Sequence, residues 1–186
     1  MPARLQDINQ AAAAGCATKV AGVKKIWIID NLEVSAVTVT ETATKAEVTA
    51  ITLSAANKAF EMTFTQDNTA FCNIQQANAG DPFDCNIYFS YDGLSAEKID
   101  MLNGLRLVCG LSAFVELASG NILFVGRDYD YTANTTAEIT KALTLKGGFQ
   151  SGLGNGDSEK VTFELVGQAK GMQLNTTLTT SALNAL

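Results

Sequence analysis

Hydrophobic and polar residues alternate along much of this chain with a period of two, which is typical of β-strands that bury one face. The alternation is clearest in Ala59–Gln66, Asp84–Tyr91 and Lys160–Gly167, where apolar side chains occupy every second position. Many short strands separated by turns predict a mainly β protein, built as an antiparallel β-barrel or sandwich. Further strand candidates are Lys25–Asp30, Glu33–Thr40, Glu47–Leu53, Phe71–Gln76 and Lys141–Phe149.

The strongest local signal is a β-hairpin within Leu107–Asp130. Two apolar arms, Leu111–Leu117 and Ile122–Val125, flank a turn that contains Gly120 and Asn121, and both of these residue types tolerate a positive φ. Alternation assigns the two faces of the first arm. One face carries Leu111, Ala113, Val115 and Leu117, and the other carries Ser112, Phe114 and Glu116.

Alternation also assigns the faces of the weaker strand Glu33–Thr40. It places Val34 and Ala36 on one face, and Val37 and Val39 on the other. A shift of one residue in register would exchange the two faces of such a strand.

One segment, about Ser95–Gly104, has the features of a helix. Ser95 is a suitable N-cap, Glu97 lies in the first turn, where the helix dipole favours a negative charge, and Gly104 is placed to end the helix. We therefore predict one short helix that packs across one face of a sheet. Its apolar stripe consists of Ile99, Leu102 and, just beyond, Leu105.

The length of 186 residues fits a single domain, residues 1–186. Residues 2–23 are rich in alanine and interrupted by glycine, so we expect an N-terminal arm with at most a short helix over Asp7–Ala14. Residues 24–170 hold the strand candidates and form the expected core. Residues 171–186 carry no charged side chain and many apolar ones, so we expect a C-terminal arm that docks on its own subunit or on a neighbour.

The composition narrows the possible functions. The formal net charge is −6, which argues against a protein that binds nucleic acid by neutralising phosphates, although nucleic acid could still slide past an acidic wall. Histidine is absent, and with it the usual general base and the commonest metal ligand. We expect no enzyme activity, no cofactor and no metal.

The four cysteines, Cys16, Cys72, Cys85 and Cys109, form no CxxC pair and match no zinc-site spacing. The first residues do not form a convincing signal peptide, so we expect reduced thiols, with Cys85 and Cys109 as buried small hydrophobic residues. No stretch approaches the ~18 consecutive apolar residues of a membrane helix, so we expect no membrane span.

Three other patterns invite a chemical interpretation. Asp128 and Asp130 could hold a cation or act as acid and base, but a solvated strand edge explains them as well. The glycine-rich stretch Gly147–Asp157 lacks the lysine and the helix of a phosphate-binding loop, which favours a hairpin loop. Asn134 and Asn175 each begin a glycosylation sequon, which has little meaning without an export signal.

Across Leu94–Lys170 the chain resembles tail-tube (major tail) proteins of tailed bacteriophages. The likeness is one of pattern: a short helix, an apolar strand, a Gly-Asn turn, a second strand that ends in glycine, a Thr- and Gly-rich segment and a terminal "TFELVG" strand. The segment Cys16–Asp30 is similar to the start of such proteins. In the order just given, the six features of Leu94–Lys170 are Ser95–Gly104, Leu111–Leu117, Ser119–Asn121, Ile122–Gly126, Lys141–Gly148 and Thr162–Gly167.

This resemblance implies a barrel or sandwich subunit of a phage virion. Six copies would form a ring in which the inner sheets join, and the rings would stack into a tube that carries double-stranded DNA without specific binding. The implied partners are further copies of the chain and a tape-measure, sheath or tail-terminator protein, with assembly in the cytoplasm of a bacterial host. The alternatives are a capsid-decoration or head–tail connector protein, and a ligand-binding β-barrel or an enzyme that uses Asp128 and Asp130.

The strand composition favours assembly for a separate reason. Proteins normally protect the edges of their sheets with charges or prolines. Here only 17% of residues are charged and two are proline, while the strands are rich in threonine and apolar side chains. Such strands are suited to pairing edge to edge in a closed ring.

Overall fold

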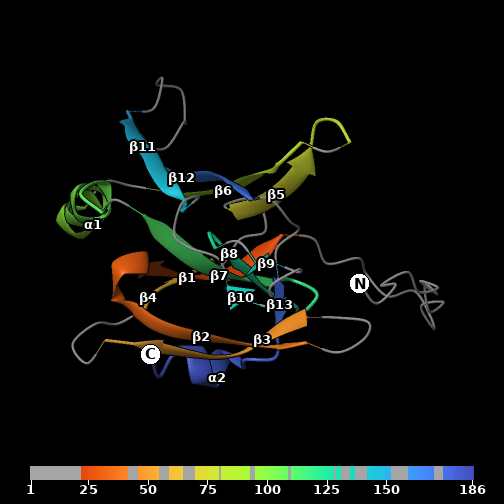
Figure 1. The fold of residues 1–186 in the computed structure, drawn as a ribbon. Coiled ribbons are helices and arrows are strands. Elements are labelled where there is room, and N and C mark those ends of the chain that lie inside the picture. Colours follow the sequence, from red (N-terminus) through yellow and green to blue (C-terminus); the bar gives the residue numbers. More distant parts are fainter. Residues whose placement is uncertain are drawn as a thin grey trace, which may run out of the picture.

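Two β-sheets packed face to face form the body of the protein, with one helix at an end of the sandwich and a short second helix beneath it (Figure 1). This computed structural model describes residues 22–41, 46–54, 59–64, 70–79, 81–92, 95–108, 110–127, 129–130, 135–136, 142–151, 159–169 and 174–186. The mainly β prediction is confirmed. Of the two predicted architectures the sandwich is the observed one, since the described strands do not close into a barrel.

The larger sheet has seven strands in the order β2-β3-β13-β8-β7-β1-β4, and the smaller has four in the order β11-β12-β6-β5. Among the described strands, β13 runs parallel to β3 and the other pairs are antiparallel. The larger sheet consists of β1 (Val23–Asp30), β2 (Val34–Glu41), β3 (Ala46–Leu53), β4 (Phe60–Thr63), β7 (Leu111–Leu117), β8 (Ile122–Val125) and β13 (Leu174–Thr176). The smaller consists of β5 (Ala70–Gln76), β6 (Phe83–Asp92), β11 (Thr144–Gln150) and β12 (Lys160–Ala169).

The remaining elements are short. A two-stranded ladder joins β9 (Tyr129–Asp130) to β10 (Thr135–Thr136), and a 3-10 turn, η1 (Asn31–Glu33), links β1 to β2. The helices are α1 (Ala96–Arg106) and α2 (Thr180–Leu183). The sequence predicted the first helix and missed the second, because a single turn contains too few residues to show a helical period.

The first hydrophobic core lies between the two sheets. It is filled by the alternating residues that the sequence pattern assigned to inward faces, including Ile87 and Phe89 of β6 and Phe163 and Leu165 of β12, all fully buried. The Phe89 and Phe163 rings stack with centroids 4.9 Å apart. Side chains therefore fill the space between the two sheets in the described part of the chain.

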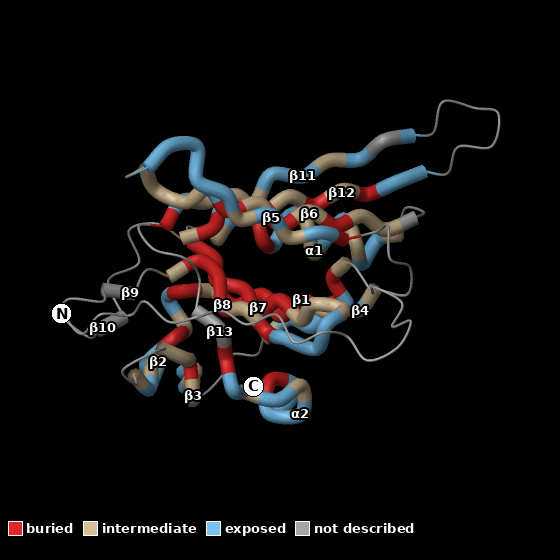
Figure 2. Tube along the Cα trace, turned by 90° about the vertical axis from the view of Figure 1, so that its right-hand side faces the viewer, coloured by how far each residue is buried: buried red, intermediate tan, exposed pale blue. Residues whose placement is uncertain are grey.

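The second core lies on the opposite face of the larger sheet. β2 and β3, at its far end, lie beneath β1, β7 and β8, together with α2 (Figure 1). Trp27, Phe114, Phe124 and Leu183 are buried between these layers. As a result, the middle layer is covered on both sides, and Figure 2 shows the buried residues concentrated in it. Such coverage explains why Phe114 is as fully buried as Ala113 and Val115, which lie on the opposite face of the same strand.

The predicted hairpin is confirmed and forms the centre of the fold. β7 and β8 pair in register from Ala113 opposite Val125 to Glu116 opposite Ile122. Gly120 has a φ of +88°, the left-handed conformation that a side chain disfavours. Ala113 and Val115 enter the first core and Phe114 the second, as alternation predicted.

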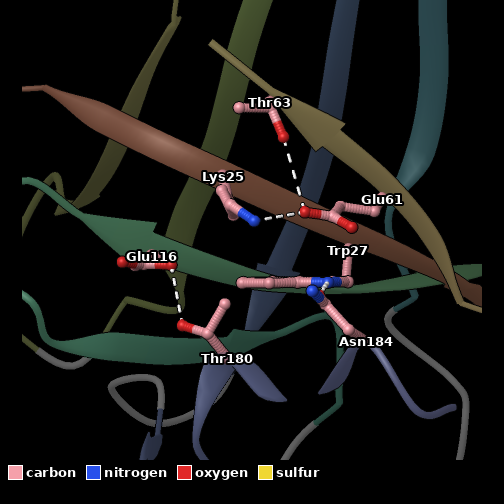
Figure 3. Close-up of polar contacts among 7 residues, drawn as sticks. All are labelled: Lys25, Trp27, Glu61, Thr63, Glu116, Thr180 and Asn184. Atoms are coloured by element: carbon pink, nitrogen blue, oxygen red, sulfur yellow. Dashed lines mark hydrogen bonds and ion pairs between the residues drawn. The ribbon is translucent and has the colours of Figure 1, made fainter. Parts of the chain in front are cut away.

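The C-terminal residues dock on their own chain. β13 is inserted between β3 and β8, and α2 is fixed under the middle layer by two side-chain hydrogen bonds (Figure 3). Trp27 Nε1 donates to Asn184 Oδ1 at 2.9 Å, and Thr180 Oγ1 donates to Glu116 Oε2 at 3.1 Å. Residues 174–186 are thus part of the sheet and its second core and do not form a free arm. Residues 1–21 lie outside the described residues, and Val23 already belongs to β1.

Helix α1 begins as predicted and ends later. Ser95 accepts a hydrogen bond from the backbone N–H of Lys98, which confirms the N-cap. The helix continues through Gly104 to Arg106, so the prediction that Gly104 ends it is wrong. Continuation buries Leu105 in the first core, which outweighs the cost of about 1 kcal/mol for glycine inside a helix.

Two further predictions need correction. β2 carries a bulge between Val34 and Ala36, so Val34 packs into the second core on the same side as Val37 and Val39. Alternation without the bulge had placed Val34 on the opposite face. The predicted loop Gly147–Asp157 overlaps the predicted strand Lys141–Phe149, and in the overlap the strand prediction is confirmed and the loop prediction is wrong: Gly147 and Gly148 belong to β11 and pair with Phe163 and Thr162.

The position of Gly147 in β11 has room only for a residue without a side chain. It pairs with the buried Phe163 and so faces the interior, where α1 approaches it. A Cβ atom there would lie 2.4 Å from Leu102 Cδ1 and 2.9 Å from the carbonyl oxygen of Thr162. The predicted packing of the helix across a sheet face is therefore observed, on the inner face of β11.

Candidate functional site: two exposed apolar surfaces

The exposed large hydrophobic side chains divide into two surfaces. In the described part of the chain there are six of them. Two, Phe71 and Phe149, lie on the two edge strands of the smaller sheet. The other four lie in or next in sequence to the residues that line a groove beside α1. These four are Leu32 (71% exposed), Phe60 (56%), Ile99 (39%) and Leu107 (77%). Apolar surface gathered in this way marks contact sites.

The groove has a volume of about 380 Å³ and lies between α1 and the end of the middle layer. On the helix side, its residues follow the i, i+4 spacing of a single helix face. On the sheet side, β1, η1, β3 and β4 each contribute. The lining consists of Ile29, Asp30, Glu33, Leu53, Phe60, Asp100, Met101, Gly104, Leu105 and Val108.

The charged side chains of this lining are all acidic: Asp30, Glu33 and Asp100. Asp30 caps η1, with its carboxylate accepting a hydrogen bond from the Leu32 N–H at 2.9 Å. The groove thus combines an apolar floor with a negative rim, which favours an apolar segment that carries positive charge.

Gly104 leaves part of the groove open. A Cβ atom added at this position would have no atom within 4 Å. The glycine that the sequence pattern suggested as a helix stop instead contributes a bare stretch of helix backbone to the groove. Nothing in the local pattern could distinguish these roles, because the difference depends on what faces the helix.

The second surface consists of the edges of the smaller sheet, β5 and β11. Within the described residues neither edge has a further strand beside it. β5 contains no charged residue and β11 contains one, Lys146. Phe71 is 48% exposed and Phe149 is 47% exposed. These edges lack the charges and prolines that normally prevent pairing with another chain.

The outer face of the same sheet is polar. Asn86 Nδ2 donates to Glu164 Oε1 at 2.6 Å, and Gln168 Nε2 donates to Asp84 Oδ1 at 2.8 Å. A shallow hollow of about 440 Å³ runs over this face, bordered mainly by amide, hydroxyl and carboxylate side chains. Phe71 stacks on Tyr88 at one side of it, with ring centroids 5.1 Å apart.

The described cysteines do not form a reactive site. Cys72 and Cys85 are reduced thiols on β5 and β6. Burial raises the pKa of the Cys72 thiol to about 12, and the neighbouring Cys85 adds to the rise. A thiol with this pKa is protonated at neutral pH and is a poor nucleophile or metal ligand. The expected role as a buried small residue is confirmed for Cys85; Cys16 and Cys109 lie outside the described residues.

A buried polar cluster at the end of β1 is structural. The Asn31 side-chain oxygen accepts hydrogen bonds from the Ser112 hydroxyl and, at 3.2 Å, from Arg127 Nε. Arg127 also donates to the Asn31 backbone oxygen, and its burial lowers the pKa of its guanidinium. Asn31 is only 1% exposed, so this cluster ties the start of β7 to η1 and offers no surface to a ligand.

The described residues do not include both of the carboxylates that the sequence suggested for chemistry. Asp128 lies outside the described residues, and Asp130 is placed in β9 by its backbone alone. No group of three or more metal-ligating side chains occurs among the residues that the structure describes. The second half of Gly147–Asp157, like Asn134, is outside them too. Asn175 lies within β13, where strands pair on both sides.

Comparisons with known proteins do not assign the chain to a family: no family model, curated protein or solved structure matches it. Within the described segments, neither helix has the length and apolar character needed to cross a lipid bilayer.

Proposed function

We propose that this chain is a structural subunit of a bacteriophage tail tube, which assembles into rings of six copies that stack into a conduit for double-stranded DNA. The proposal starts from the sequence resemblance across Leu94–Lys170. The observation that carries it is the pair of open edges on the four-stranded sheet, which hold one charged residue between them, Lys146, and a half-exposed phenylalanine each.

Edge pairing between copies would explain why Phe71 and Phe149 are half exposed in the single copy. If β5 of one copy pairs with β11 of the next, the four-stranded sheets join into one continuous sheet around the ring. The contact covers Phe71 and Phe149, and it satisfies the backbone groups that each edge strand otherwise presents to water. An arrangement of this kind closes by rotation and leaves no free edge.

The outer face of the joined sheet would line the conduit. Its charged residues are mixed: Asp84, Glu164, Lys146 and Lys160 lie on it, and Asp92 pairs with Lys160 in the register, which gives three acidic residues and two basic ones. Its other side chains are largely amides and hydroxyls. A surface without a basic cluster does not hold DNA by phosphate neutralisation. DNA can then pass along it without being bound, which is the property that a delivery tube requires.

Electron microscopy of the purified full chain tests the proposal directly. Stacked rings with a central channel are expected, and particles that remain monomeric at high concentration would contradict it. Phe149→Lys, which places a charge on one edge, should prevent ring formation. Ala50→Lys, at an exposed position on β3, is the matched control and should leave the rings intact.

The same images separate the tube from its nearest alternatives. A head–tail connector forms a single ring that does not stack, and a capsid-decoration protein forms neither rings with a channel nor tubes. A ligand-binding protein would remain monomeric and melt at a higher temperature when its ligand is added.

A further inference from the structure

We propose that the acidic groove beside α1 binds the N-terminal segment, residues 1–21, of a second copy of this chain. The inference rests on the proposed function in that it names a contact between copies. It is carried by three observations: the chemistry of the groove, the charge and composition of the segment, and the positions of both along β1.

The groove and the segment have complementary chemistry. The groove has an apolar floor and three carboxylates, Asp30, Glu33 and Asp100, with no basic residue in its lining. Residues 1–21 contain two basic residues, Arg4 and Lys19, and one acidic residue, so they carry a formal charge of +1. The chain as a whole carries −6, which leaves −7 for the remainder.

The segment also has apolar side chains suited to the groove. Leu5 and Ile8 lie close to Arg4 in sequence, so one short stretch offers two large apolar groups and a cation. The same stretch contains Asp7, so the net positive charge of the segment comes from Lys19. Phe60, which lines the groove, is more than half exposed in the single copy, and an occupant would cover it. Opposite charges at the rim would guide the segment to the groove and set its orientation.

The position of the segment in the chain favours binding to the groove of a second copy over binding to the groove of the same copy. At the start of β1, Val23 pairs with Leu117, and Gly22 accepts a hydrogen bond from the Ala118 N–H beside the hairpin turn. The groove lies at the other end of β1, where Asp30 contributes to its lining. Eight residues of strand separate the two ends by about 23 Å.

The direction of the chain decides the geometry of the contact. β1 runs toward the groove, so the preceding residues enter the molecule from the far end. A copy placed in the same orientation beyond that end presents its groove to this segment. The contact is therefore head to tail, and contacts of this kind propagate into stacks. Edge pairing would make the ring, and the segment would join one ring to the next.

A binding measurement tests the contact without requiring tubes. The receptor is the full chain with Leu5→Asp and Ile8→Asp, which leaves the groove intact. The probe is a fluorescent synthetic peptide of residues 1–21. We expect saturable binding that weakens as salt is added, because Asp100 is exposed and Asp30 and Glu33 are partly exposed, so salt screens all three charges. Absence of binding would overturn the inference.

Gly104 provides a matched pair of variants in the groove. Gly104→Leu places a side chain in the open space, and with Asp100→Lys it should weaken peptide binding at least about tenfold. Gly104→Ala makes the same change to the helix backbone without filling the groove, and should bind nearly as well as the parent. Equal binding by both would show that the peptide lies elsewhere.

Mixing two defective chains tests whether the contact joins different copies. The Leu5→Asp, Ile8→Asp chain has a functional groove, and the Gly104→Leu, Asp100→Lys chain has a functional segment. Each alone should fail to stack. Their mixture should form a species with twice the mass of either, because one intact contact remains per pair. A mixture without this species, when the unmodified chain does stack, would mean that the segment does not join copies.

The outcomes separate this inference from the proposed function. Peptide binding by a chain that forms no tubes would support the proposed contact at the groove and contradict the proposed tail-tube function. Normal tubes from the Gly104→Leu, Asp100→Lys chain would support the proposed tail-tube function and contradict the proposed contact at the groove.

Discussion

The two sheets of this protein are covered in different ways. The middle of the larger sheet is buried on both faces, by the smaller sheet on one side and by β2, β3 and α2 on the other. The smaller sheet is buried on one face only, with its outer face polar and its edges exposed. The comparison separates a region that stabilises the fold from a region available for contact with other molecules.

The first prediction contrasts two phenylalanines in these regions. Phe114→Ala should lower the free energy of unfolding by about 3–5 kcal/mol, because it removes a fully buried ring between the middle layer and α2. Phe71→Ala should cost less than about 1 kcal/mol, since nearly half of that side chain is already exposed. Urea unfolding of the two variants checks this. Similar losses would mean that the smaller sheet contributes more to stability than its burial indicates.

The second prediction concerns the C-terminal helix. Leu183 is fully buried in the second core, so Leu183→Ala should cost about 2–4 kcal/mol in the same urea measurement. Leu178→Ala, only partly buried beside the same core, should cost clearly less. If Leu183→Ala changed stability by less than about 0.5 kcal/mol, residues 174–186 would be an arm after all.

A smaller effect is expected from the two adjacent glycines of β11. Gly147→Ala should destabilise the protein by about 1–3 kcal/mol, because its methyl group would meet Leu102 and the Thr162 carbonyl. Gly148→Ala should be neutral or slightly stabilising, since the added group has no atom within 4 Å. Thermal unfolding of the pair measures how closely α1 is held against the sheet.

The last prediction is a loss of stability that is confined to alkaline pH. Burial raises the pKa of Cys72 from 9.0 and of Tyr91 from 10.0, each to about 12 in the folded protein. The unfolded chain ionises first, so the contribution of both groups is complete below pH 9 and is lost as the pH rises from 9 to 12. Unfolding at several pH values, with Cys72→Ala and Tyr91→Phe combined, should show a shallower decline. An unchanged decline would assign it to other groups.

The sequence predicted local structure well where one physical constraint dominated. The hairpin has alternating apolar arms and a Gly-Asn turn, and both arms were found at the expected residues. The N-cap of α1 was also readable, because a serine side chain acts on a backbone N–H only three residues away. These features depend on near neighbours in sequence, which a single chain reveals.

The predictions from sequence were wrong where residues far apart in the chain determine the local structure. The bulge in β2 depends on its pairing with β3, and it reversed the face assigned to Val34. Gly104 continues a helix because Leu105 reaches the core. The local preferences of glycine are the same at a helix end and inside a helix, so the sequence could not show that Gly104 lines a groove and does not end the helix.

The sequence by itself determined the mainly β class, the positions of the strands and the low charge that suits subunit contact, because alternation and composition are properties of the chain alone. Only the tertiary structure decided which edges stay open, how residues 174–186 complete the larger sheet, and that Gly104 and three carboxylates share one groove. Those outcomes follow from packing between elements far apart in sequence, and packing selects one arrangement among the many that the same strands permit.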